Sequence, residues 1–218
     1  PPQMFDEIRA ALQQLPAIGA RALLITGEGR AFCSGADLAG RGEAPTTGRG
    51  ANTHKVLTQN YSPTMVAVSQ LGMPVVAAVN GVAAGIGASL ALAADFTLAA
   101  RSAYFLEAFV NIGLVPDGGA TWMLARQVGK ARATEMMMLG ERISAEKAEA
   151  WGLIHAAVDD AELMPRALAL AERLANGPTR ALGLMRQGLA RALSQTYEEA
   201  LATEACHQAL CADSTLGE

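Results

Sequence analysis

The chain has 218 residues, of which 51% are hydrophobic and 5% aromatic, and its formal net charge at pH 7 is -4. This composition supports one globular domain with a sizeable core and excludes a disordered protein. Because lysine and arginine form no run, neither nucleic acid nor an anionic membrane is expected as a partner. The cysteines, Cys33, Cys206 and Cys211, form no metal-type cluster and favour a reducing compartment, so we predict a cytoplasmic protein.

The first part of the chain alternates between helical and strand patterns, which predicts a mostly parallel sheet. In chain order we expect a helix over 4–15, a strand over 21–26, a mobile loop over 40–50, a helix over 54–71, a strand over 75–79, a glycine turn with a helix through 93, and short strands over 96–99 and 104–105. The apolar stretch 73–94 is broken by Asn80 and by glycines, so it is expected to be core rather than a membrane span.

From residue 120 onward the pattern is almost entirely helical. The predicted helices are 121–128, 131–139, 145–151, 163–175, 179–193 and 197–210. We therefore divide the chain into an α/β core over 1–128 and a helical region over 129–218.

Two glycine turns follow apolar strands. Residues 80–89 follow the strand 75–79, and residues 32–38 follow the strand that ends near Thr26. Backbone N–H groups at such a turn, in front of a helix, can hold an oxyanion. The same pattern also serves phosphate sites, close helix packing and ordinary turns. Two donors from two turns are what a tetrahedral or enolate oxyanion needs.

Four segments carry a resemblance to a known family: Phe32–Leu38, Pro74–Gly85, Gly113–Gly119 and Ile143–Leu153. Together they resemble the enoyl-CoA hydratase/isomerase (crotonase) family, and are most similar in pattern to Δ3,Δ2-enoyl-CoA isomerases and phenylacetate-pathway ring enoyl-CoA isomerases. The resemblance implies an α/β spiral of β-β-α units, the ClpP/crotonase fold, with a helical C-terminal trimerisation region. It also implies an acyl-CoA thioester as substrate, no separate cofactor, and a homotrimer or dimer of trimers. The strands with which the family opens are missing, so we expect the chain to be a fragment.

The family's oxyanion donors correspond to the backbone N–H groups of Ala36 and Ile86. Only the backbone is used, so the side chain of Ile86 narrows the pocket without abolishing the donor. Arg30 and Lys55 are candidates for the CoA phosphates, although each could be a solvated surface charge. The substrate-binding residues that the resemblance implies are Ser34, Gly35, Asp37, Leu38, Gly85, Phe109, Leu114 and Arg30, with the backbone of 34–38 at the adenine end of CoA.

The two glutamates that hydratases of the family use correspond here to Ser89 and Phe109. Neither can act as a general base. Glu107 could share a strand face with Phe109, but an exposed charge at the rim is the expected arrangement.

Asp117 stands where isomerases of the family carry their single acid/base carboxylate. Asp before Gly-Gly could equally cap the helix that starts near Ala120. The helix dipole would lower the pKa of Asp117 and an apolar pocket would raise it. The apolar residues available for such a pocket are Phe109, Ile86, Val115 and Trp122.

These residues predict enoyl-CoA isomerisation with Asp117 as the catalytic group beside Ala36 and Ile86. Enoyl-CoA hydration is the alternative, and a CoA-binding subunit without activity is a third possibility. The family's dehalogenases also use an aspartate here, but their histidine would fall near Ser62, so dehalogenation is disfavoured. No metal role is expected for the histidines, which are His54, His155 and His207.

Overall fold

The computed structural model describes residues 2–36 and 47–213. The first part of the chain forms α1 (Pro2–Gln14), β1 (Leu23–Thr26), β2 (Ala31–Cys33), α2 (Arg49–Val56), α3 (Ser62–Ser69), β3 (Val75–Val79), β4 (Val82–Ala84), α4 (Ile86–Leu92), β5 (Phe96–Ala100) and β6 (Tyr104–Leu106). A π-helical turn, Leu57–Tyr61, joins α2 to α3.

The second part consists of α5 (Ala120–Gln127), α6 (Gly129–Leu139), β7 (Ile143–Ser144), α7 (Ala145–Ala150), β8 (Ala156–Val158), α8 (Leu163–Ala175), α9 (Thr179–Ala192) and α10 (Tyr197–Ala212). Short 3-10 turns occupy Val110–Ile112 and Asp160–Glu162. The helices predicted from periodicity are confirmed, with ends that shift by one to a few residues.

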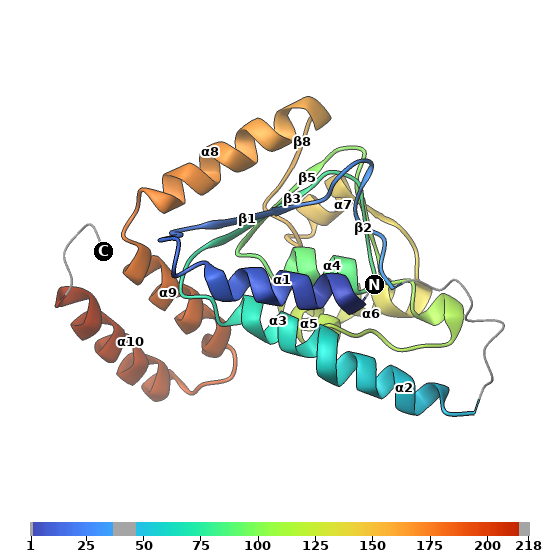
Figure 1. The fold of residues 1–218 in the computed structure, drawn as a ribbon, viewed down its shortest axis with the longest axis horizontal. Coiled ribbons are helices and arrows are strands. Elements are labelled where there is room, and N and C mark those ends of the chain that lie inside the picture. Colours follow the sequence, from blue (N-terminus) through green and yellow to red (C-terminus); the bar gives the residue numbers. More distant parts are fainter. Residues whose placement is uncertain (1, 37–46, 214–218) are drawn as a thin grey trace.

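The strands form two four-stranded sheets (Figure 1). The first has the order β1-β3-β5-β8 and is parallel throughout; the second has the order β2-β4-β6-β7, in which only β7 is antiparallel. The strands β1 to β6 therefore alternate between the sheets, which is the predicted β-β-α arrangement. The region after residue 120 is mainly helical, as predicted, and two short strands that were not predicted, β7 and β8, each complete a sheet. The division at residue 128 stays a prediction.

The helix α4 lies at the centre of the molecule, and all seven of its residues are buried. It packs on β2, β3, β4 and α5, which its small side chains permit. The amphipathic helix α8 covers the first sheet, while α9 and α10 form a hairpin beside it (Figure 1). This packing fixes the N-terminal end of α4, where the second glycine turn enters the helix.

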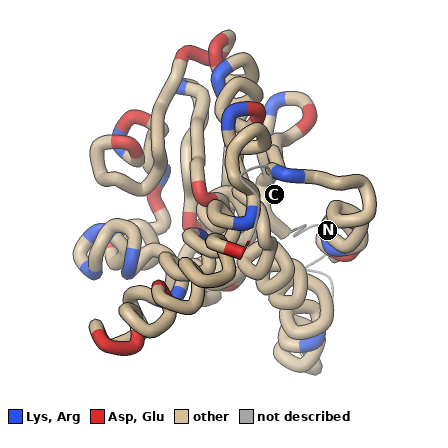
Figure 2. Tube along the Cα trace, turned by 90° about the vertical axis from the view of Figure 1, so that its left-hand side faces the viewer, with Lys and Arg blue, Asp and Glu red and all other residues tan. Residues whose placement is uncertain are grey.

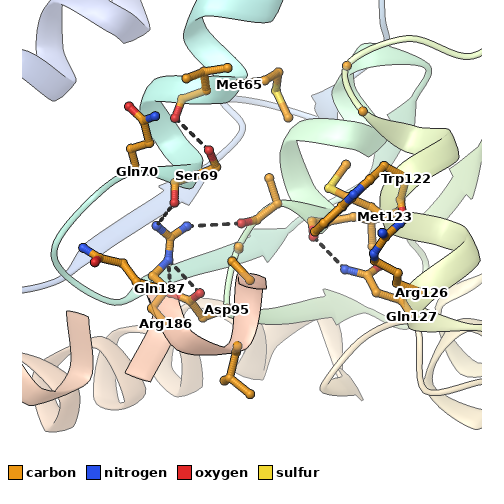
Figure 3. Close-up of a pocket in the computed structure, with 18 of the residues that line it drawn as sticks. Met65, Ser69, Gln70, Asp95, Trp122, Met123, Arg126, Gln127, Arg186 and Gln187 are labelled. Carbon is orange, nitrogen blue, oxygen red and sulfur yellow. Dashed lines mark hydrogen bonds and ion pairs between the residues drawn. The ribbon is translucent and has the colours of Figure 1, made fainter. Parts of the chain in front are cut away.

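An ion pair between a buried arginine and a partly exposed aspartate attaches α9 to the core (Figure 3). Arg186, only 8% exposed, donates from Nε to both carboxylate oxygens of Asp95 at 2.7 and 2.8 Å. The same guanidinium donates to the carbonyls of Ser69 and Leu71, and Asp95 also accepts from the N–H of Val75. Burial raises the pKa of Asp95 despite the opposing charge of Arg186. The pair is therefore a costly arrangement that holds only while both partners are present.

The predicted loop 40–50 differs from the structure at its end. Residues 40–46 lie outside the described residues, whereas Arg49 and Gly50 already belong to α2. Lys and Arg residues are interspersed with Asp and Glu along the described chain (Figure 2). None of the helices in the described ranges is long and apolar enough to cross a membrane.

Candidate functional site

Two of the cavities in the described part of the molecule bear on the site. The larger, about 1040 Å³, lies beside the Arg186–Asp95 ion pair and includes Trp122 and Arg126 (Figure 3). The smaller, about 510 Å³, is lined by residues of both glycine turns and by Asp117. The smaller cavity is the candidate active site, because it alone of the two holds the residues that can carry the predicted chemistry.

The two glycine turns meet at this cavity. Gly35 has a φ of 95°, and a Cβ placed there would lie 3.0 Å from the carbonyl oxygen of Ala84, so glycine is what lets the first turn approach β4. Ala36, which follows it, is exposed on the cavity wall.

On the other side of the cavity, the N–H of Gly85 donates to the carbonyl of Leu106 at 2.8 Å. Ile86 is the first residue of α4, so its N–H has no acceptor within the helix. The structure thus brings Ala36 and Ile86 to one cavity, as an oxyanion site between them requires.

Asp117 lies half-buried in the wall of the same cavity. The capping role was wrong, because the N-cap of α5 is Gly119 with a φ of 86° and no side chain caps the helix. Instead, the main-chain carbonyl of Asp117 accepts from the hydroxyl of Ser89 at 3.0 Å and from the N–H of Ala120 at 3.1 Å. The carboxylate takes no part in these bonds, and its Oδ1 is buried without a partner among the described residues.

Burial raises the pKa of Asp117 to about 6. Of the four apolar residues expected around it, Phe109 and Ile86 line the cavity and are 8% and 2% exposed. The expectation was wrong for Val115 and Trp122, which are 80% and 47% exposed and lie outside this cavity. The side chain of Asp117 is therefore shielded from water by the second glycine turn, by α4 and by the segment after β6.

The substrate-binding residues predicted from the resemblance fall into three groups. Ser34, Gly35, Gly85, Phe109 and Leu114 line the cavity. Arg30 and Lys55 are exposed and do not line it, so their contact with the CoA phosphates stays a prediction. Asp37 and Leu38 lie outside the described residues.

Several lining residues were not predicted, and Tyr61 and Arg49 are two of them. Tyr61 ends the π-helical turn, is 4% exposed, and packs its ring 4.7 Å from that of Phe5. Burial first, and then the charges of Asp117 and Cys33, raise the pKa of Tyr61, so its hydroxyl remains a hydrogen-bond donor. No sequence signal marks a π-helical turn, and Arg49 fell in a segment expected to be loop.

Glu107 is fully buried, so the expectation of an exposed charge at the rim was wrong. It directly follows β6 and, like Phe105 and Phe109, which are 0% and 8% exposed, it points inward, whereas residues 106 and 108 are only partly buried. Burial, and secondly the charge of Asp117, raises the pKa of Glu107 to about 8. Neither carboxyl oxygen has a hydrogen-bond partner among the described residues.

No three His, Cys, Asp or Glu side chains within the described ranges lie close enough to form a metal site. The groups that line the cavity thus include two backbone donors, a carboxylate with a raised pKa and a phenol, while the buried Glu107 is not one of the lining residues.

Comparison with known proteins agrees with this geometry. A family model described as enoyl-CoA hydratase/isomerase matches residues 1–214. A protein named probable enoyl-CoA hydratase from Rhodobacter capsulatus is 47% identical over 202 residues, which cover 93% of this chain and 76% of that protein. The 1,2-epoxyphenylacetyl-CoA isomerase of Escherichia coli is 45% identical over 194 residues, covering 89% of this chain and 74% of the relative.

Solved structures lead to the same family. The crystal structure of an enoyl-CoA hydratase/isomerase from Cupriavidus metallidurans superimposes with a TM-score of 0.89 at 31% identity, covering 97% of this chain and 78% of that chain. The fold is therefore the one that the sequence motifs predict. The chain belongs to the enoyl-CoA hydratase/isomerase (crotonase) family of enzymes.

Proposed function

We propose that this enzyme isomerises the carbon–carbon double bond of an enoyl-CoA thioester. The carboxylate of Asp117 removes a proton from the carbon next to the thioester carbonyl and returns it two carbons away. The N–H groups of Ala36 and Ile86 bind the thioester oxygen and stabilise the enolate formed between these steps. The observation that carries the proposal is a carboxylate that caps nothing, set in the cavity that both donors line.

The pKa of about 6 for Asp117 suits this role. Such a group is charged at neutral pH and yet is a stronger base than an ordinary aspartate. One carboxyl group suffices, because the proton that it takes is the proton that it returns.

The cavity lacks the two glutamates that hydratases of the family use to hold water. Ser89 is buried and its hydroxyl donates a hydrogen bond to the carbonyl of Asp117, and Phe109 has an apolar ring at the cavity. The E. coli relative is named as an isomerase of an acyl-CoA, which fits the same class of substrate. The trimeric assembly, the cytoplasmic location and the absence of a separate cofactor stay predictions.

Hydration of a 2-enoyl-CoA is the second candidate. The observation in its favour is Glu107, a second carboxyl whose pKa is raised by burial and then by the charge of Asp117, and the R. capsulatus relative is named as a probable hydratase. In that case two carboxyl groups would act on one water molecule.

Replacement of Asp117 by asparagine tests the proposal. The amide keeps the size of the side chain, so the fold and thioester binding survive, while isomerisation falls by several orders of magnitude once the sole proton carrier is gone. Asp213→Asn, which changes an exposed aspartate, is the matched control and keeps wild-type activity. Conversion of a 3-enoyl-CoA to its 2-enoyl isomer, hydration of a 2-enoyl-CoA and thermal melts are measured on each variant.

Wild-type isomerisation in Asp117→Asn contradicts the proposal. Rapid hydration that depends on Ser89 or Glu107 establishes the hydratase instead. Tight binding of CoA thioesters without turnover of 2-enoyl, 3-enoyl or aryl substrates would identify a binding subunit without activity.

A further inference from the structure

The proposed reaction uses one carboxyl group, but the structure buries two. Glu107 is wholly enclosed, with both of its oxygens lacking a partner among the described residues, and Oδ1 of Asp117 is in the same state. A buried polar group without a partner is costly, so it is uncommon in folded proteins unless it has a function. Glu107 and Asp117 interact electrostatically, which indicates that the two carboxyl groups share one function.

The surrounding contacts hold Glu107 close to the reacting groups. The residue before it, Leu106, accepts from the N–H of Gly85, the glycine that introduces the donor Ile86. Beyond it, the N–H of Leu114 donates to the carbonyl of Phe109 at 2.9 Å, so the chain folds back before it reaches Asp117. Glu107 therefore lies behind the cavity wall, whereas Asp117 lies in that wall.

Four titratable groups surround this region within the described residues. Glu107 comes from the end of β6, Asp117 from the turn before α5, Tyr61 from the π-helical turn and Cys33 from β2. Arg49, on α2, lines the same cavity. The charge of Asp117 raises the pKa of both Glu107 and Tyr61, in each case after the larger effect of burial.

We propose that Glu107 is a positioning residue that remains a neutral carboxylic acid behind Asp117, so that the two carboxyl groups hold one proton and one negative charge between them. Like charges in a shared enclosed space cannot both form without a large cost. The less enclosed Asp117 takes the charge, and the fully enclosed Glu107 keeps the proton.

This arrangement matters for the reaction of the previous section, on which the inference rests. Proton removal by Asp117 moves the negative charge from its carboxylate to the thioester enolate, within the same cavity. If Glu107 loses its proton, its carboxylate repels that of Asp117, and the two side chains no longer both keep the positions that proton transfer requires. The neutral state of Glu107 is therefore a condition for turnover, although Glu107 does not contact the substrate.

The test is the pH dependence of kcat/KM for wild type and Glu107→Gln. In wild type, activity rises as Asp117 loses its proton, with its pKa of about 6, and falls as Glu107 ionises, with its pKa of about 8. If turnover requires one group of that pKa to be protonated, the activity at pH 9 is about 10-fold below the plateau. Glutamine is neutral at every pH, so this variant keeps its plateau activity to pH 9, with a loss of less than about 2-fold.

Glu107→Met provides a second neutral variant in case the amide does not fold, and it too loses the alkaline fall. Glu149→Gln, at an exposed glutamate of α7, controls for the loss of a charge and keeps the wild-type profile. The proposal is overturned by an alkaline fall that persists in a folded Glu107 variant, or by a uniform loss of activity at every pH. The pH profiles are measured for the reaction that the wild type catalyses, either isomerisation or hydration. A wrong assignment of the reaction is therefore distinguished from a wrong assignment of Glu107.

Discussion

The burial of Glu107 predicts that the stability of the protein depends on pH through this one side chain. Its pKa is raised from 4.5 to about 8 in the folded protein. Below pH 4.5 both the folded and unfolded states hold the proton, so ionisation of Glu107 costs nothing. Between 4.5 and about 8 the unfolded chain releases the proton while the folded protein keeps it, so stability falls as the pH rises. Above about 8 both states are ionised and the loss is complete.

The size of this effect follows from the width of that window. Each pH unit corresponds to about 1.36 kcal/mol, so the full loss is roughly 4 to 5 kcal/mol, and about 3 kcal/mol of it is present at pH 7. Glu107→Gln does not ionise and escapes the loss. For a chain of this size, 3 kcal/mol corresponds to a rise in Tm of about 10 °C at pH 7.

Urea unfolding and thermal melts of wild type and Glu107→Gln, taken at intervals from pH 4.5 to 9, measure the difference directly. The two proteins should be closest at pH 4.5 and should separate steadily up to about pH 8, with the variant the more stable. Glu149→Gln, at an exposed site, should follow the wild type throughout. A difference between Glu107→Gln and wild type that does not change with pH would refute the reasoning, because it would mean that Glu107 ionises normally in the folded protein.

Three further substitutions test other parts of the structure. Ala36→Pro removes one oxyanion donor and lowers turnover by roughly two to three orders of magnitude, whereas Ala36→Ser keeps it; full activity in both would show that this turn is not a donor. Arg186→Leu removes the hydrogen bonds of the buried guanidinium, leaves the partly exposed Asp95 without its cation, and lowers the free energy of unfolding in urea by about 1 to 3 kcal/mol, while Arg191→Leu, at an exposed site of the same helix, changes it by less than about 0.5 kcal/mol; equal losses would contradict the role of the ion pair. Gly118→Ala, at a φ of 63° and with a methyl group directed at the side chain of Ile86, is expected to cost about 1 to 3 kcal/mol, and an unchanged midpoint in the same assay would refute that packing.

The fold could be predicted from the sequence where its elements are long or strongly apolar. The helix α8 begins and ends at the predicted residues, and β3 matches the predicted strand over Val75–Val79. The strands β2, β4, β7 and β8 were missed because each has only two or three residues, too few for an alternating pattern to appear. Their existence depends on pairing with strands that are distant in the sequence.

The backbone donors of the site could be predicted from the sequence, but the roles and burial of its side chains could be predicted only in part. The two glycine turns were recognised because their motifs are local, and the structure brings Ala36 and Ile86 to one cavity. The role of Asp117 could not be separated from that of a helix cap, since the decision depends on the positive φ of Gly119. The burial of Glu107 was missed because it depends on which face of the chain the second sheet covers.

The π-helical turn at Leu57–Tyr61 adds one residue to the helical wall of the cavity, and this insertion sets the orientation of α2 relative to α3. An α-helix rotates by about 100° per residue, so deletion of one residue from this turn would turn α2 by that angle relative to α3. The face of α2 that now lines the cavity, formed by Arg49, Asn52, Thr53 and Val56, would then point elsewhere. Within this fold, a change of one residue in helix length can thus replace one whole wall of the substrate cavity while leaving the oxyanion donors and Asp117 untouched.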